Sequence, residues 1–215
     1  MTLTLHRPWL DFDLEDSCQV LSWAPWRPGL VPASRILWRE VRNADLPPHL
    51  DATDWLERQL VARDASDAVC FLTARDVSAH HRAEAQVEGV HVTAVATLGL
   101  SNAERIGTRR PVIPRSWGTI NLAVKCALPL APAALIEALS IATQARTTAL
   151  LEAQLPLETG PATGTGTDCI AIAAPEGSAL HAGLHTPLGE AIGRAVLAVI
   201  SAGVQDWRRA YAGTA

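Results

Sequence analysis

One stretch in the second half of the chain alternates a strand pattern, a long helix pattern and a second strand pattern, and it constrains the fold more than any other feature. Residues 119–128 form a short apolar, β-branched run, as a buried strand does. Pro132 stands where the first turn of a helix tolerates proline, and apolar residues at steps of three and four predict a helix to about Gln154. Residues 169–174 are again apolar. This βαβ-like order predicts a sheet covered by helices.

The remaining patterns add strands and helices to that unit. Short apolar runs bounded by polar residues predict strands over residues 18–23, 34–41, 68–73 and 90–98. Capping residues followed by apolar helical spacing predict two further helices, over residues 51–63 and 186–211. The early strands follow one another closely, as in hairpins. We therefore predict one mixed α/β domain over residues 1–215, a layered fold with a mixed β-sheet packed by helices.

Charge balance and cysteine spacing argue against several classes of protein. The 18 basic and 22 acidic residues are scattered and give a net charge of −4, so no nucleic acid and no anionic membrane is expected as a partner. Glu190 and Arg194 interrupt the apolar segment 188–204, which argues against a membrane span. The four cysteines lie far apart without a C-x-x-C pair, so neither a disulfide framework nor a zinc site is expected. The N-terminus lacks the apolar core of a secretory signal, and a cytoplasmic protein is expected.

Residues 163–168, Thr-Gly-Thr-Gly-Thr-Asp, run directly into the last predicted strand. Three hydroxyls around one acid, with two glycines, favour part of a functional site. A phosphate-binding P-loop would need a lysine, and a dinucleotide fingerprint would need a third glycine and a following helix, so nucleotide hydrolysis is disfavoured. The alternative is a glycine-rich connector in which Asp168 is hydrogen-bonded within its own loop.

Three further segments carry candidate groups. Ser101 and Glu104 have capping-box spacing, which predicts that a short helix starts there. The free backbone amides of its first turn, with the Asn102 side-chain amide beside them, could stabilise a developing oxyanion. The alternative is a merely structural cap. Thr119 and Asn121 share one face of a strand, and the alternative there is a strand end facing water.

The third segment is the start of the last helix. His185 and Glu190 lie near this helix N-terminus, where a histidine and a carboxylate suit acid–base work. The motif H-E-x-x-H is absent, so a metal site is not expected. The motif G-x-S-x-G is absent as well, which argues against an ordinary serine hydrolase.

Taken together, these segments resemble the adenosylcobinamide amidohydrolase family of corrinoid salvage. The resemblance rests on the order of six stretches: residues 71–74, 97–103, 118–121, 141–147, 162–168 and 182–190. It implies a cytoplasmic hydrolase that cleaves the amide between a corrin propionate side chain and aminopropanol and releases adenosylcobyric acid. It also implies that cobalt arrives only as part of the corrinoid substrate, with no cofactor of the protein's own. Arg146 stands where a lysine is common in the family.

The resemblance assigns no catalytic role, so the mechanism is predicted from chemistry. In one hypothesis water attacks, with Asp168 as general base, Asn102 or backbone amides as oxyanion donors, and Glu190 or His185 assisting the amine. In the other, Thr165 or Thr167 is a nucleophile that forms an acyl-enzyme.

The substrate is expected to contact a wider set of residues. These are Ser101, Thr119, Asn121, Arg146, Thr163, Gly164, Thr165 and Gly166. Candidate walls for the corrin ring are Trp23, Trp26, Trp38 and Trp117; the alternative for each is a core or half-buried surface aromatic. The expected partner is this small molecule, and a homo-oligomer is left open. The alternatives are a non-catalytic corrinoid-binding or escort protein and an amidase for a different amide.

Overall fold

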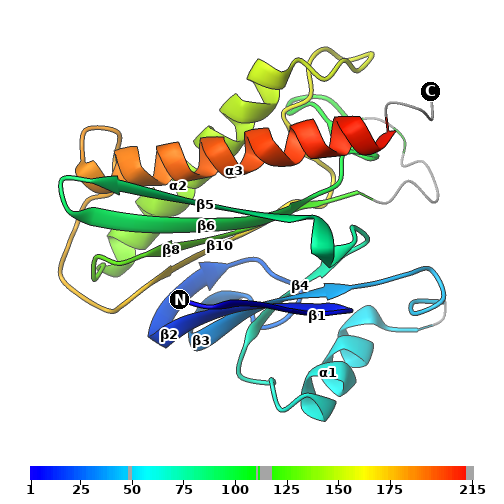
Figure 1. Cartoon of the computed structure of the whole chain (residues 1–215), viewed down its shortest axis with the longest axis horizontal. Coiled ribbons are helices and arrows are strands. Elements are labelled where there is room, and N and C mark those ends of the chain that lie inside the picture. The colour runs from blue at the N-terminus through cyan, green and yellow to red at the C-terminus, as the bar shows by residue number, and fades with distance from the viewer. Residues whose placement is uncertain (48–49, 110, 112–117, 212–215) are drawn as a thin grey trace.

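A computed structural model describes residues 1–47, 50–109, 111 and 118–211 of the chain (Figure 1). Within these residues eight strands form one sheet, and two short segments, β7 (Ala103–Glu104) and β9 (Gly164–Thr165), form a second. The large sheet contains β1 (Leu3–His6), β2 (Trp9–Ser22), β3 (Gly29–Glu40), β4 (Val69–Thr73), β5 (His80–Val87), β6 (Val90–Leu98), β8 (Ile120–Cys126) and β10 (Cys169–Ala174). The helices are α1 (Ala52–Ala62), α2 (Pro132–Ala153), α3 (Pro187–Tyr211) and the short 3₁₀ helix η1 (Val77–Ala79).

The sheet is mixed, which confirms the predicted fold class. Its strand order is β4-β3-β2-β10-β8-β6-β5, with β1 paired to β2. β8 and β10 are parallel neighbours joined through α2, so the predicted βαβ unit is present. β3 and β4 are also parallel and are joined through α1, although the early strands were expected to form hairpins. Antiparallel pairing joins β2 to β3 and β5 to β6.

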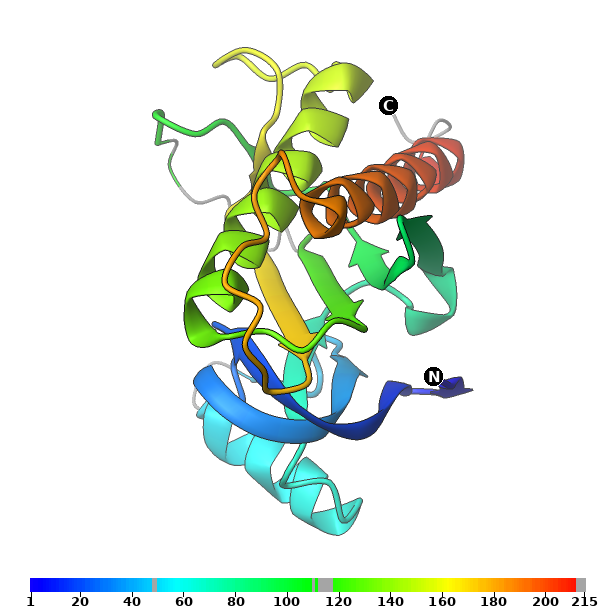
Figure 2. The ribbon, with the colours of Figure 1, turned by 90° about the vertical axis from the view of Figure 1, so that its left-hand side faces the viewer.

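The sheet curves so strongly that its inner face encloses a core of its own. Leu10, Phe12 and Trp38 from one half of the sheet share a buried cluster with Val95 and Ala171 from the other half. A register shift in β2 between Asp13 and Cys18 is a bulge of the kind that bends a strand. The helices cover the outer face: Figure 2 shows α2 and α3 over one half of the sheet and α1 over the other.

Most helix predictions agree with the structure, but one predicted helix is absent and one strand was missed. Asp51 caps α1 by accepting hydrogen bonds from Thr53 N (2.7 Å) and Asp54 N (3.1 Å). No helix follows Ser101: the chain makes a turn there and enters β7, because residues 103–104 pair with β9. The edge strand β5 was not predicted, since charged residues occupy its exposed face.

The last helix is a core element. By length and mean hydropathy α3 resembles a membrane-spanning helix, but 56% of its most apolar stretch is buried inside the protein. Its buried side packs on α2, β5 and β6. Gly203 lets α3 lie close to β6, since a Cβ there would lie 3.2 Å from Cβ of Leu98. The C-terminal half of α3 therefore lies over the end of the sheet where β6 finishes.

Candidate active site

The end of the sheet where β4 and β6 finish and β8 and β10 begin brings the polar segments together. Thr97 is aligned with Asn121, and Asn121 with Cys169, across three neighbouring strands. The glycine-threonine loop precedes Cys169 and therefore lies at this end.

The Asp168 carboxylate is fully hydrogen-bonded by groups of its own loop, of β8 and of α2. Its Oδ1 accepts hydrogen bonds from the Thr165 hydroxyl, Thr165 N (3.1 Å) and Ile120 N (3.3 Å). Its Oδ2 accepts from Thr165 N (3.1 Å) and forms an ion pair with Nη1 of Arg146. Both side chains are nearly buried, with 9% of Asp168 and 11% of Arg146 exposed. Four donor groups thus occupy the acceptor sites of this carboxylate, and it acts as a clamp for the loop.

Arg146 comes to this clamp from α2. Burial lowers the pKa of its guanidinium, yet an arginine stays charged in a protein. Gly164 has to be glycine for steric reasons, because a Cβ at that position would collide with Nη1 of Arg146 and lie 2.8 Å from Oδ2 of Asp168. At Gly166, by contrast, a Cβ would meet nothing nearer than Nδ2 of Asn102 at 3.8 Å.

The clamp places the Thr167 hydroxyl against the neighbouring segments. Thr167 Oγ1 donates a hydrogen bond to Gly118 O (3.2 Å) and accepts one from Nδ2 of Asn102 (3.4 Å). The backbone carbonyl of Thr167 accepts from the Thr119 hydroxyl (2.7 Å). Asn121 donates to Leu72 O (2.8 Å) and so ties β8 to the end of β4.

A largely apolar cavity of about 260 Å³ opens beside Thr167. One part of its polar wall is Gly118, Thr119, Asn121 and Thr167, all from segments singled out in the sequence. The other part is Arg42, Asn43 and Thr73, which lie at or after the ends of β3 and β4. Its apolar wall comes from the ends of β3 and β4 and the β2–β3 connection, with Pro25, Val41, Leu46 and Leu72. Cys169 also lines this cavity, but burial raises its pKa to about 11, so the thiol is a poor nucleophile at neutral pH.

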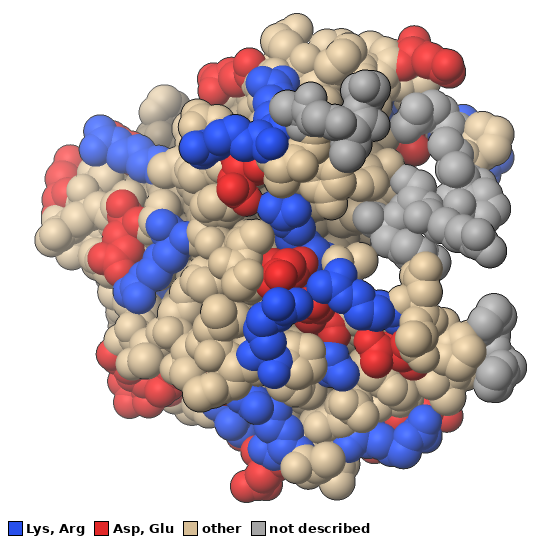
Figure 3. Space-filling view, turned by 45° about the vertical axis from the view of Figure 1, so that its right-hand side comes forward, with Lys and Arg blue, Asp and Glu red and all other residues tan. Residues whose placement is uncertain are grey.

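A second, polar cavity of about 130 Å³ adjoins the first. The two cavities share Arg42, Ala74 and Gly118 in their walls. The polar cavity is further lined by Arg75, Asp76, Gly99, Ser101 and Tyr211. Figure 3 shows acidic and basic side chains gathered beside a hollow on this face of the molecule.

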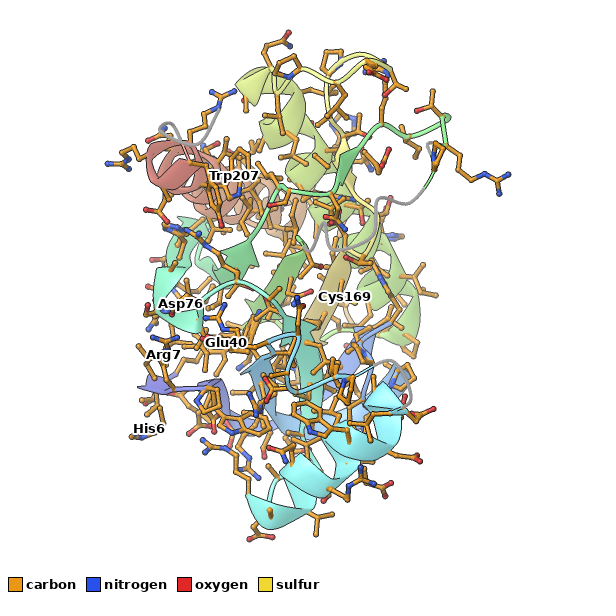
Figure 4. The ribbon with its side chains drawn as sticks, turned by 90° about the vertical axis from the view of Figure 1, so that its right-hand side faces the viewer. His6, Arg7, Glu40, Asp76, Cys169 and Trp207 are labelled. Atoms are coloured by element: carbon orange, nitrogen blue, oxygen red, sulfur yellow. The ribbon has the colours of Figure 1, made fainter. Side chains whose placement is uncertain are left out.

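Ion pairs hold the charged walls of the polar cavity. Glu40, only 4% exposed, pairs with Arg42 and with Arg7 (2.8 Å) and accepts a hydrogen bond from Val77 N (3.2 Å). Arg7 also pairs with Asp76 (3.2 Å). Figure 4 shows Arg7, Glu40 and Asp76 gathered in one place, between the first strands and η1.

A family model for adenosylcobinamide amidohydrolases (CbiZ) matches residues 2–212, nearly the whole chain. The chain belongs to the adenosylcobinamide amidohydrolase family. This confirms the family that the six sequence stretches indicated. Among solved structures, a similar one is the crystal structure of the PH0078 protein from Pyrococcus horikoshii OT3, with 10% identity and a TM-score of 0.45 over 92% of this chain and 77% of that chain. No curated protein matches the chain.

Most of the predicted site residues lie at the end of the sheet that carries the two cavities, here called the cavity end. The residues that line a cavity are Ser101, Thr119, Asn121 and Thr167. Those that form or adjoin the loop behind it are Asn102, Arg146, Gly164, Thr165, Gly166 and Asp168. Thr163 has a structural contact instead, since its hydroxyl accepts a hydrogen bond from Ile106 N (2.7 Å).

His185 and Glu190 lie elsewhere, so the prediction that they act beside Asp168 is wrong. They flank the N-terminus of α3, whereas Gly203 of the same helix meets Leu98 at the cavity end. Thirteen residues of helix from Glu190 to Gly203 span roughly 20 Å. Glu190 forms an exposed ion pair with Arg194 (2.5 Å). The segment before α3 packs instead on the start of α2, where Ala182 N donates to Glu137 (2.6 Å).

The tryptophans predicted as walls of a corrin pocket differ in their burial and in their contacts. Trp38 is completely buried in the inner core, and the Trp26 indole donates to Ser66 O (3.1 Å) and packs towards α1. Neither side chain lines the apolar or the polar cavity. Trp23 is 45% exposed, and its indole donates to Asp168 O (2.6 Å). Trp117 lies outside the described residues.

Sequence reasoning missed Arg42, Arg75 and Asp76. Each follows the end of a strand that was predicted, β3 for Arg42 and β4 for the other two. Because β3 and β4 are parallel, their carboxyl ends meet at one edge, which is a common place for a ligand site. The missing information was the parallel pairing of these two strands.

Proposed function

We propose that this chain hydrolyses the amide that joins aminopropanol to the corrin side chain of adenosylcobinamide, with adenosylcobyric acid as the product. The membership of the family supports this reaction. The observation that carries it is the placement of Thr167: this residue follows the clamped loop and lines a cavity, and its hydroxyl is hydrogen-bonded to the Asn102 amide.

The scissile amide is best placed near Gly118, where the two cavities share a wall. A cavity of about 260 Å³ is at the small end of ligand pockets, so it receives an edge of the corrin and its side chain rather than the whole ring. Most of the ring then lies outside, near the exposed Trp23 indole. An indole suits that position because it offers a large apolar surface.

The clamp around Asp168 bears on the mechanism. A general base needs a lone pair directed at the proton it removes, whereas the acceptor sites of Asp168 are already occupied by donors. This favours attack by the Thr167 hydroxyl, or by water held beside it, over a water mechanism with Asp168 as base. The proton of the attacking hydroxyl or water then passes to the nitrogen of the leaving amine as the C–N bond breaks. Asn102 Nδ2 lies near enough to Thr167 to donate to the oxyanion that either attack creates.

We propose that cobalt enters this site only within the corrinoid. Among the described residues, no group of three or more histidine, cysteine or carboxylate side chains is arranged to hold a metal ion. The reaction assigned to the side chains needs only hydrogen-bond donors, a nucleophile and proton transfer.

The test is incubation of the purified chain with adenosylcobinamide and detection of adenosylcobyric acid and aminopropanol by mass spectrometry. We expect both products in equal amounts. Corrinoid binding without products would instead indicate an escort protein, and neither binding nor products would indicate a different amide. The variants Thr165→Val and Thr167→Val then separate the mechanisms, because full turnover in both rules out a threonine acyl-enzyme.

A further inference from the structure

We propose that the polar cavity is the subsite of the leaving amino alcohol, with the Asp76 carboxylate bound to its ammonium group and Arg42 facing the new corrin carboxylate. This inference rests on the proposed hydrolysis and assigns roles to two residues that the sequence motifs do not include. Its basis is the relation between the two cavities and the charges in the walls of the smaller one.

The position of the shared wall sets which part of the substrate enters which cavity. Gly118 borders both cavities, and its carbonyl is hydrogen-bonded to Thr167. An amide attacked beside Thr167 therefore has one substituent in the apolar cavity and the other in the polar cavity. The apolar cavity suits the corrin edge. The polar cavity has a volume of about 130 Å³, enough for several water molecules. A three-carbon amino alcohol fits into the same space.

The charges of the products match the charges of the walls. In the hydrolysis the C–N bond breaks, the oxygen of water bonds to the carbonyl carbon, and both protons of water finish on nitrogen. At neutral pH a neutral amide thus becomes a carboxylate and an ammonium ion. Arg42, which borders both cavities, faces the place of the carboxylate, and Asp76 lies in the polar cavity, where the ammonium forms.

Asp76 is prepared for a cation by its own contacts. Its Oδ1 accepts hydrogen bonds from Ser78 N (2.8 Å) and the Ser78 hydroxyl (2.6 Å), and its Oδ2 pairs with Arg7 (3.2 Å). These donors, the Ser78 hydroxyl foremost, lower the pKa of Asp76, so it remains an anion at neutral pH. A carboxylate has about four acceptor positions, which leaves room for one ammonium donor. The side chain is 36% exposed, so a ligand can reach it.

The arginines around the cavity do not turn it into an anion site. Arg42 is paired with Glu40, and Arg75 with Asp206 (2.8 Å). Each guanidinium on the wall therefore already has a carboxylate partner. Arg42 is nevertheless 55% exposed, which leaves its remaining N–H donors available to a product carboxylate beside Gly118.

The experiment is an NMR titration of the ¹⁵N-labelled full chain with 1-amino-2-propanol, and with 1,2-propanediol as the uncharged analogue. We expect the amine to shift the amide signals around Asp76, Gly99 and Ser101, and the diol to bind about tenfold more weakly, since a hydrogen-bonded charge is lost. Asp76→Asn, which keeps the capping contacts of an Asx residue, should weaken amine binding about tenfold. Asp67→Asn is the matched control, because Asp67 is also ion-paired but lies outside both cavities, and it should leave binding unchanged.

The outcomes separate this inference from the reaction itself. If wild-type protein hydrolyses adenosylcobinamide but Asp76→Asn binds the amine as wild type does, the subsite is wrong and the reaction stands. Equal binding of the amine and the diol overturns the subsite in the same way. If amine binding depends on Asp76 but no adenosylcobyric acid is released, the ammonium site stands and the proposed reaction is wrong.

Discussion

The two ends of the helix-covered half of the sheet carry similar residues but use them differently. At one end, glycines, threonines and Asp168 adjoin two cavities. At the other end, around the start of α3, glycines, Thr186 and Glu190 form a helix cap. The Thr186 hydroxyl accepts a hydrogen bond from Gly189 N (2.9 Å) and donates to Gly183 O (2.8 Å). In sequence alone both segments are candidates for a site.

The difference between the ends lies in what remains after structural needs are met. At the α3 cap a Cβ on Gly189 would collide with the Gly183 carbonyl, so this glycine allows close packing. Glu190 projects towards solvent and Arg194. At the cavity end Asp168 and Arg146 are paired with each other, but Thr167 still lines a cavity. A polar motif indicates a site when some of its residues line a cavity after the structural hydrogen bonds of the motif have been made.

The largest contrast is expected from removing one arginine at each end. Arg146→Met leaves the buried Asp168 without its ion pair and should lower the free energy of unfolding by about 3 kcal/mol. Arg194→Met removes an exposed i,i+4 pair and should cost less than about 0.5 kcal/mol. Urea unfolding of both variants measures the difference. Equal losses would contradict the clamp.

The next contrast concerns turnover and replaces one threonine at each end. Thr167→Val should lower kcat for adenosylcobinamide about 100-fold or more, because the hydroxyl lies where the amide is attacked. Thr186→Val should cost about 1 kcal/mol of stability through the lost N-cap and leave kcat within about twofold. Steady-state assays on the folded variants decide. A larger kcat loss in Thr186→Val would move the site to the other end.

A smaller effect is expected when the predicted acid–base groups at the α3 cap are neutralised. His185→Gln and Glu190→Gln should each leave kcat within about twofold, since both residues lie roughly 20 Å of helix away from the cavity end. Kinetics measured across neutral pH provide the check. Loss of one limb of the pH profile in either variant would restore these residues to the mechanism.

The smallest effect concerns His81, which lies near the C-terminal half of α3. Burial lowers the pKa of His81 below its ordinary value of 6.5, against the opposing influence of Asp206. The unfolded chain therefore takes up this proton more readily, so stability falls as pH drops below about 6.5. His81→Gln should flatten the decline of Tm between about pH 6.5 and pH 5. An unchanged slope would show that His81 makes no contribution to it.

Local sequence patterns predicted the βαβ unit well, whereas the polar segments were brought together by the family resemblance. Periodic apolar residues in 132–154 and the capping contacts of Asp51 act within a few residues, so the sequence displays them directly. Arg42 and Asp76 were missed because their meeting depends on β3 and β4 pairing in parallel across more than thirty residues. His185 was misplaced for the converse reason: its helix runs back along the whole sheet, which local sequence does not show.

The most direct test is an NMR shift map of the ¹⁵N-labelled chain with adenosylcobyric acid, the expected product, which is not turned over. We predict that the NMR signals of the backbone amides of Gly99, Gly118, Thr119 and Thr167 shift, because these residues line the two cavities. Shifts confined to residues 183–190, with the cavity end unchanged, would contradict it.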